Sequence, residues 1–293
     1  MRRTTKIIIG IILSIFLLSL LHIIGYSFTD RKNYKGTYRY KTIQIPQTEK
    51  STGINIAAYN VIKLELSDSI FYFPYDENGL FIYPATTTNE ENRLFIPEAL
   101  YDCISTQSNN DTLSIKIKMD EIREKYDTMD KEKAKVILST GSSRPVSGVN
   151  LILHTSNVNI ISQLYGLHIQ IRNIEADSIK IHNVYGNITI DSCKAKAVEP
   201  HSNHPVSISN CSIQTMKIDL DQLTNLNIDG DNDVDTYYFT GGKQSNDITT
   251  KGPDKKIVWQ PKNNEAELNF KIKTNTGPFN FEMQTNDLPA DGH

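Results

Sequence analysis

A short phrase of alternating polar and apolar residues, closed by Asn or Ser, recurs between Leu167 and Ile228. It reads HIQIRN at 168–173, SIKIHN at 178–183, NITIDS at 187–192 and VSISN at 206–210. Each phrase is too short to bury its apolar side alone, so neighbouring phrases must stack to form a core. The sequence therefore predicts an all-β protein whose short strands stack as a right-handed parallel β-helix or β-solenoid.

The N-terminus combines a basic start with an uncharged apolar run. Arg2, Arg3 and Lys6 precede Ile7 to Ile24, which is dominated by Ile and Leu. A helix rises about 1.5 Å per residue, so this run and its flanks would cross most of a ~30 Å hydrocarbon layer. A cleaved signal peptide is the alternative. We predict a transmembrane helix acting as a signal anchor in a single-pass inner-membrane protein, with the rest exported to the periplasm or cell surface.

Length and composition agree with an exported β protein. The 293 residues carry a formal net charge of −3, which argues against a nucleic-acid partner because such proteins present a basic stripe. We divide the chain into a basic start and anchor at 1–29, N-terminal strands at 30–140 with a charged insertion near 120–135, solenoid repeats at 141–242, and C-terminal strands with a disordered tail at 243–293.

Two of the three cysteines close matching phrases. Cys193 follows IDS and Cys211 follows ISN, 18 residues later. If two phrases complete one coil, these residues lie one above the other, about 4.8 Å apart. That separation permits either a ladder of two buried thiols or a disulfide. The turn residues Asn173, Asn183 and Asn210 also indicate structure, because Asn amides bond to neighbouring backbone and Asn tolerates left-handed angles.

The sharpest cluster of chemical groups is a run of alternating acids, Asp229, Asp231, Asp233 and Asp235. Carboxylates of this kind are ligands for Ca²⁺, although the EF-hand pattern fails because Val234 stands at its glycine position and Thr240 at its final Glu. A solvated turn is the plainer interpretation. Stacked acids such as Asp219 and Asp229 would also suit a β-helical polysaccharide lyase or hydrolase.

The order of the strands resembles a known family. A strand at Tyr59–Leu66 is followed by the phrase NDTLSI at 110–115, then KVIL at 135–138, and then the repeats. This order is similar to that of the family named putative auto-transporter adhesin, head GIN domain, of Bacteroidetes-type bacteria, over roughly Ile54–Thr240. Asn and Cys turns replace the family's Ser-Gly-Ala turns. The resemblance implies an envelope-associated β-helix and supplies no catalytic residues.

Two functions from different classes follow from these features. The first is a non-enzymatic, membrane-anchored envelope protein, an adhesin or scaffold that binds protein or glycan. The second is an enzyme that acts on polysaccharide through the acidic face between Asp219 and Asp235. We predict the first, with no cofactor unless calcium binds the acidic run. Unpaired strand edges at the ends of the stack also predict self-association.

Overall fold

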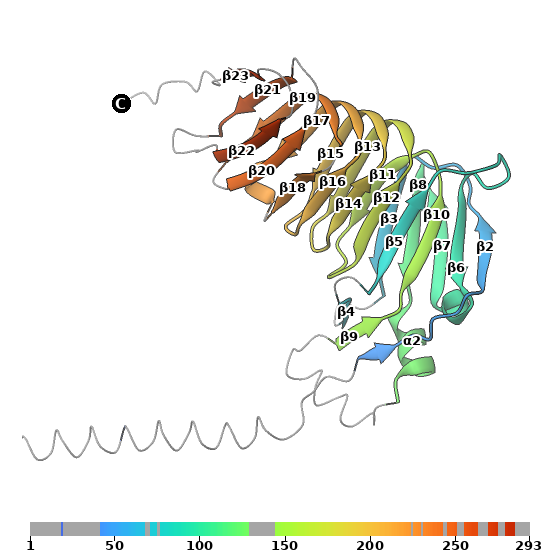
Figure 1. Ribbon diagram of the computed structural model, residues 1–293. Helices are drawn as coiled ribbons and strands as arrows, with labels where there is room; N and C mark the ends of the chain where they lie inside the picture. The colour runs from blue at the N-terminus through green and yellow to red at the C-terminus, as the bar shows by residue number, and fades with distance from the viewer. Residues whose placement is uncertain are drawn as a thin grey trace, which may run out of the picture. The chain divides into compact units, whose positions relative to one another are not determined.

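The chain divides into two compact units, Met1–Lys41 and Thr42–His293. The computed structural model describes Ser19 and residues 42–67, 71–74, 77–128, 144–223, 225–229, 231–242, 245–250, 255–262, 269–274 and 279–284. The second unit contains all the described strands (Figure 1). Our finer division at residues 29, 140 and 242 stays a prediction.

Two ten-stranded sheets dominate the second unit. The first, called here the β12 sheet, has the order β2 (Ser51–Asn55), β6 (Arg93–Pro97), β10 (Asn150–His154), β5 (Gly79–Tyr83), β12 (His168–Arg172), β14 (Ile188–Asp191), β16 (Val206–Ser209), β18 (Leu226–Asp229), β20 (Ser245–Thr250) and β22 (Asn269–Thr274).

The second large sheet, called here the β13 sheet, has the order β23 (Phe279–Met283), β21 (Lys255–Gln260), β19 (Asp233–Thr240), β17 (Ser212–Asp219), β15 (Lys194–His201), β13 (Glu175–Asn183), β11 (Val158–Ser162), β3 (Val61–Leu66), β8 (Thr112–Ile117) and β7 (Ile104–Asn109). A small third sheet joins β1 (Ile43–Gln44), β9 (Arg144–Ser147) and β4 (Phe71–Tyr72). Short helices are η1 (Glu98–Cys103), α2 (Met119–Tyr126) and η2 (Leu220–Gln222).

Successive strands of the repeat region alternate between the two large sheets. From β12 onward, even-numbered strands join the β12 sheet and odd-numbered strands join the β13 sheet, and all of these pairs are parallel. The register places the same type of residue at the same position on neighbouring strands. One example is the buried column formed by Ile171, Ile190, Ile208 and Ile228. The alternating residues therefore point their apolar side chains into one core between the sheets.

The all-β class is confirmed, but our prediction of a right-handed parallel β-helix, or β-solenoid, is wrong because the sheets are mixed. Strand β6 pairs antiparallel with both β2 and β10, and β7 pairs antiparallel with β8. Strands β3 and β5, which come early in the chain, pair with β11 and β12 of the repeat region. The segment before the repeats lacks their periodic phrase. Its strands pair antiparallel with a neighbour, as β7 does with β8, or pair with strands far along the chain, as β3 and β5 do.

The membrane prediction also needs correction. In the part of the chain that the structure describes, no helix is long and apolar enough to span a bilayer. Helix α2 has eight residues, which rise about 12 Å, and it is charged. The predicted transmembrane signal anchor and the single-pass inner-membrane location are therefore not supported. The apolar run at 7–24 lies outside the described residues, apart from Ser19.

The turns of the repeat region use asparagine in two ways. Asn173 and Asn210 adopt left-handed backbone angles, with φ of 57° and 55°, and Ser192 does the same at 55°. Asn183 is fully buried, and its side-chain Nδ2 donates to the carbonyl oxygens of Leu167 at 2.9 Å and Asn187 at 3.2 Å. The left-handed angles shape the turns at Asn173 and Asn210, and the Asn183 side chain satisfies backbone carbonyls, so all three act on the backbone of the turns.

Asn232 is a second fully buried turn residue and lies inside the acidic run. Its side chain is fully buried, and its Oδ1 accepts the N–H of Cys211 at 3.0 Å. Its Nδ2 donates to the carbonyls of Ile208 at 3.1 Å and Asp229 at 2.5 Å. One amide thereby joins the β18–β19 turn to the turn of the preceding coil.

Replacing Asn232 by Ala should lower the free energy of unfolding by about 1–3 kcal/mol, because buried donors and acceptors lose their partner. Urea unfolding followed by circular dichroism measures this. Asn227→Ala, at an exposed position of β18, is the matched control and should change stability by no more than about 0.5 kcal/mol. Equal losses in the two variants would contradict the role assigned to Asn232.

Asp191 links two coils through hydrogen bonds to its carboxylate. The hydroxyl of Ser209 donates to Oδ1 at 2.8 Å, and Nδ2 of Asn210 donates to the same oxygen at 3.0 Å. These donors stabilise the ionised form, so the pKa of Asp191 lies below its usual value. The carboxylate therefore stabilises the fold above the unfolded-state pKa of about 3.9, and this contribution is lost as the pH falls through the lower folded-state pKa.

Asp191→Asn should accordingly destabilise the protein at pH 7, and the difference from the native chain should shrink as the pH falls below about 4. Urea unfolding of both chains across that range measures the difference. A stability gap that stays constant with pH would show that the Asp191 carboxylate contributes nothing through its ionisation.

The two cysteines of the repeat region form a ladder of buried thiols. Cys193 and Cys211 are both free, and the N–H of Cys193 lies 3.4 Å from Sγ of Cys211. A hydrogen bond to Cys211, together with burial, raises the pKa of the Cys193 thiol. Burial likewise raises the pKa of Cys103. The raised pKa makes the thiols of Cys193 and Cys103 poor nucleophiles. The hydrogen bond with Cys193 lowers the pKa of Cys211 instead, and there burial alone shields the thiol from reagents.

We expect all three cysteines to resist a maleimide reagent in the native chain and to react once it is unfolded in urea without reductant. Mass spectrometry counts the labels. If Cys193 and Cys211 were bridged instead, only Cys103 would react in urea until a reductant was added.

Candidate functional site: a polar groove across the β13 sheet

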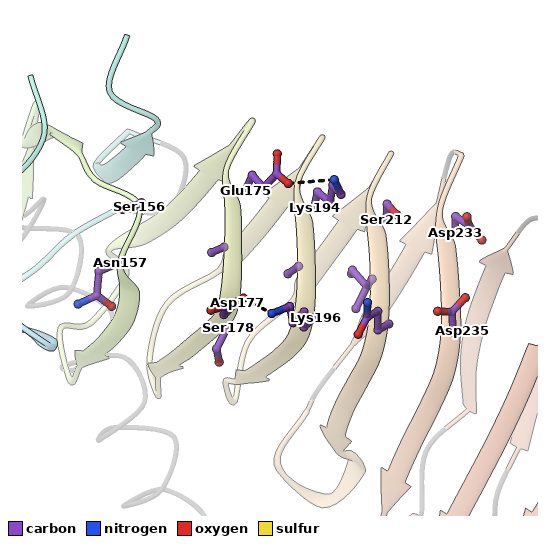
Figure 2. Close-up of a pocket in the computed structure, with 14 residues that line it drawn as sticks. Ser156, Asn157, Glu175, Asp177, Ser178, Lys194, Lys196, Ser212, Asp233 and Asp235 are labelled. Atoms are coloured by element: carbon purple, nitrogen blue, oxygen red, sulfur yellow. Dashed lines mark hydrogen bonds and ion pairs between the residues drawn. The ribbon is translucent and has the colours of Figure 1, made fainter. Parts of the chain in front are cut away.

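A groove crosses the first halves of four neighbouring strands, β13, β15, β17 and β19 (Figure 2). Its volume is about 860 Å³. Most of its lining side chains are polar: Ser156, Asn157, Glu175, Asp177, Ser178, Lys194, Lys196, Ser212, Gln214, Asp233 and Asp235, with Ala176, Ala195 and Ile213 between them. Its long axis therefore runs across the coils and not along any one strand.

Strand register arranges the lining residues in two rows. The first row contains register partners on successive strands, Glu175, Lys194, Ser212 and Asp233. The second row lies two residues further along each strand and contains Asp177, Lys196, Gln214 and Asp235. All eight are exposed, whereas the intervening Ala195, Ile213 and Val234 are buried. Strand alternation thus turns both rows outward.

The alternation of exposed and buried residues breaks along this face. On β17, Gln214 is exposed and Thr215 is half-exposed before Met216 returns to the core. Two consecutive outward residues interrupt the alternation that a flat strand would keep. The same break occurs at the second row of each neighbouring strand, where Ala195 pairs with Ile213 and Ala197 with Thr215. The break recurs in register, so it lies at the same level on neighbouring strands that line the groove.

Ion pairs occupy the β13–β15 end of the groove. Lys194 lies 2.9 Å from Glu175, and Lys196 lies 2.7 Å from Asp177. The hydrogen bond to Asp177, together with its charge, raises the pKa of Lys196. All four side chains are at least 67% exposed, so water and salt screen each pair and its contribution to stability is small. Their main effect is to neutralise one another's charge.

The opposite end is organised by a buried cation. Lys255 of β21 is 6% exposed, forms an ion pair with Asp233 and lies 3.9 Å from Asp235. Between the two charged ends, Ser212 and Gln214 of β17 present a hydroxyl and an amide. The groove therefore offers neutral donors and acceptors at its centre and paired charges at both ends.

The structure separates the acidic residues that the sequence grouped. Asp229 ends β18 in the β12 sheet, whereas Asp233 and Asp235 begin β19 in the β13 sheet. Asp219 ends β17, and Lys262 donates to its two carboxylate oxygens at 2.9 and 3.0 Å. Since Asp233 pairs with Ser212 at the start of β17, Asp219 lies about a strand length, or ~23 Å, away.

This separation affects both chemical hypotheses for the acidic run. Asp219 and Asp229, the acid pair suggested for an enzyme, lie on different sheets. Within the described ranges, no group of three or more His, Cys, Asp or Glu side chains is placed to hold a metal ion. Calcium binding by Asp229, Asp231, Asp233 and Asp235 stays a prediction.

Sequence reasoning missed most of the groove. Glu175, Lys194 and Ser212 are polar residues at strand starts and match no motif. Only their position in the repeat could have identified them, because aligning the repeats on Cys193 and Cys211 places Lys194 opposite Ser212.

No protein-family model matches the chain, and no curated protein sequence matches it. Solved structures to which the chain is similar include a putative adhesin from Bacteroides fragilis, with 12% identity and a TM-score of 0.36, a putative adhesin from Parabacteroides distasonis, with 8% identity and a TM-score of 0.36, and a putative adhesin from Parabacteroides merdae, with 8% identity and a TM-score of 0.34. Each match covers 83% of this chain and 98–100% of the solved chain.

The resemblance to the head GIN-domain family is not confirmed, because no family model matches.

Proposed function

We propose that this chain is a non-enzymatic, adhesin-like binding protein that holds an extended, neutral glycan in the groove of the β13 sheet. The observation that carries the proposal is the pattern of the two rows. Neutral hydrogen-bonding groups on β17 lie between ion pairs on either side. The same pattern crosses several coils, so a ligand that follows it must be long.

Charge favours a neutral ligand. An anionic chain would have to displace Asp177 from Lys196, and a cationic chain would have to displace Lys194 from Glu175. A sugar hydroxyl both donates and accepts hydrogen bonds. It therefore suits the Gln214 amide, the Ser212 hydroxyl and the outer oxygens of the paired carboxylates without separating charge.

The same contacts support binding over catalysis. General acid–base chemistry needs carboxyl groups placed on either side of the bond to be cleaved, usually with perturbed pKa values. Glu175, Asp177 and Asp233 each face a lysine instead. A paired carboxylate is a good hydrogen-bond acceptor and a poor proton shuttle.

A glycan array probed with the full chain tests the proposal, followed by calorimetry on any glycan that binds. Gln214→Trp fills the centre of the groove from an exposed position and should weaken binding at least tenfold. Lys217→Trp is the matched control, because Lys217 is exposed on the same strand outside the groove lining, and it should bind as the native chain does.

Three results would contradict the proposal. The first is binding that Gln214→Trp leaves unchanged, which would place the ligand elsewhere. The second is binding to peptides with no binding to glycans. The third is cleavage of a bound glycan during incubation, which would make the protein an enzyme.

A further inference from the structure

The C-terminal end of the β13 sheet presents an open strand edge. Strand β23 is the last strand of that sheet and, within the described ranges, pairs only with β21 (Figure 1). Its Phe281 and Met283 are 54% and 53% exposed. Their register partners on β21, Ile257 and Trp259, are buried. Among the described residues, the apolar columns of the core therefore end at the exposed side chains of Phe281 and Met283.

The opposite end of the two sheets is built differently. Helix η1 contacts the edge strands β2 and β7 as well as β6. Helix α2 packs on η1, where the Tyr126 hydroxyl donates to the carbonyl of Ala99 at 2.6 Å and Lys118 Nζ donates to that of Asp102 at 3.2 Å. Strand β7 itself is mostly polar, with the sequence ISTQSN. The two edge strands of the β13 sheet thus differ in polarity, because β7 is mostly polar and β23 exposes Phe281 and Met283.

Strand β23 also lacks the usual protection of a sheet edge. Natural edge strands carry Lys or Pro, or are shortened or covered, to prevent pairing with another chain. The sequence FNFEM contains neither Lys nor Pro. Its single charge, Glu282, forms an ion pair with Lys256 of β21 at 2.6 Å. The edge is thus available for a ladder of backbone hydrogen bonds.

We propose that β23 pairs antiparallel with β23 of a second copy of this chain, about a two-fold axis through Phe281 and normal to the sheet. In this register Phe281 meets its own counterpart, and Asn280 lies opposite Glu282 of the second copy. No like charges then face each other across the contact, which would be destabilising in a cross-strand pair. The β13 sheets of the two copies would become one continuous sheet.

The proposed contact closes on itself. Because the same strand is used by both copies, the interface is isologous and stops at two chains. Head-to-tail stacking would instead need the edge of β7, which η1 contacts. A dimer, and not a fibre, is therefore the expected assembly.

Sedimentation equilibrium of the full chain, with and without mild detergent, tests the proposal. The native chain should dimerise in both conditions, and the double variant Phe281→Lys/Met283→Lys should weaken dimerisation at least tenfold. Both substitutions are at exposed positions, so folding should persist. The matched control Tyr101→Lys/Ile161→Lys changes two residues that are 46% and 39% exposed elsewhere, and it should dimerise as the native chain does.

A cysteine substitution tests the register separately. Phe281→Cys should form a disulfide between copies on mild oxidation, visible on a non-reducing gel, whereas Tyr101→Cys should not. A full chain that is monomeric would overturn the proposal, including one that dimerises only after residues 285–293 are removed. Dimerisation that persists unchanged in Phe281→Lys/Met283→Lys would also overturn it.

Discussion

In-register parallel pairing between neighbouring coils is the constraint on which the rest of this structure depends. Strands of the repeat region such as β14 and β16 have only four residues, too few to be stable alone. Pairing sets Ile190 on Ile208 and so builds continuous buried columns. A shift of one residue would turn each apolar side chain to solvent, so the core itself holds the register.

The same register creates the surface as a consequence. Once Ala195 and Ile213 are fixed in the interior, Lys194 and Ser212 must lie side by side outside. Core packing places no demand on what these outward residues are, because they are exposed. The polar rows of the groove are therefore free to differ in composition, and their mixture of ion pairs and neutral groups is the part of the molecule that a ligand would meet.

The sequence predicted what depends on local repetition. Strands at 168–172 and 188–191 occur where the alternating phrases place them, and the thiols of Cys193 and Cys211 are adjacent. It did not predict the mixed sheets, because β3 and β5 pair with strands that are distant in the chain. The acidic run at 229–235 was predicted as one cluster, but the chain passes from one sheet to the other in the middle of this run. The buried Asn232 holds the turn at that point.

The outer face of the sheets and their edge strands are under different physical constraints, and both bear on binding strength. The outer face accepts any polar residue, whereas an edge strand has unpaired backbone groups that must be covered or paired. A two-fold axis normal to the sheet at β23 keeps the outer face of both copies on the same side. Two grooves would then face one surface, so a second contact would form at high effective concentration and raise avidity without any new interaction. If the groove binds glycan and β23 pairs two copies as we propose, weak hydrogen bonding in each groove would be enough for firm attachment, because two grooves would bind together.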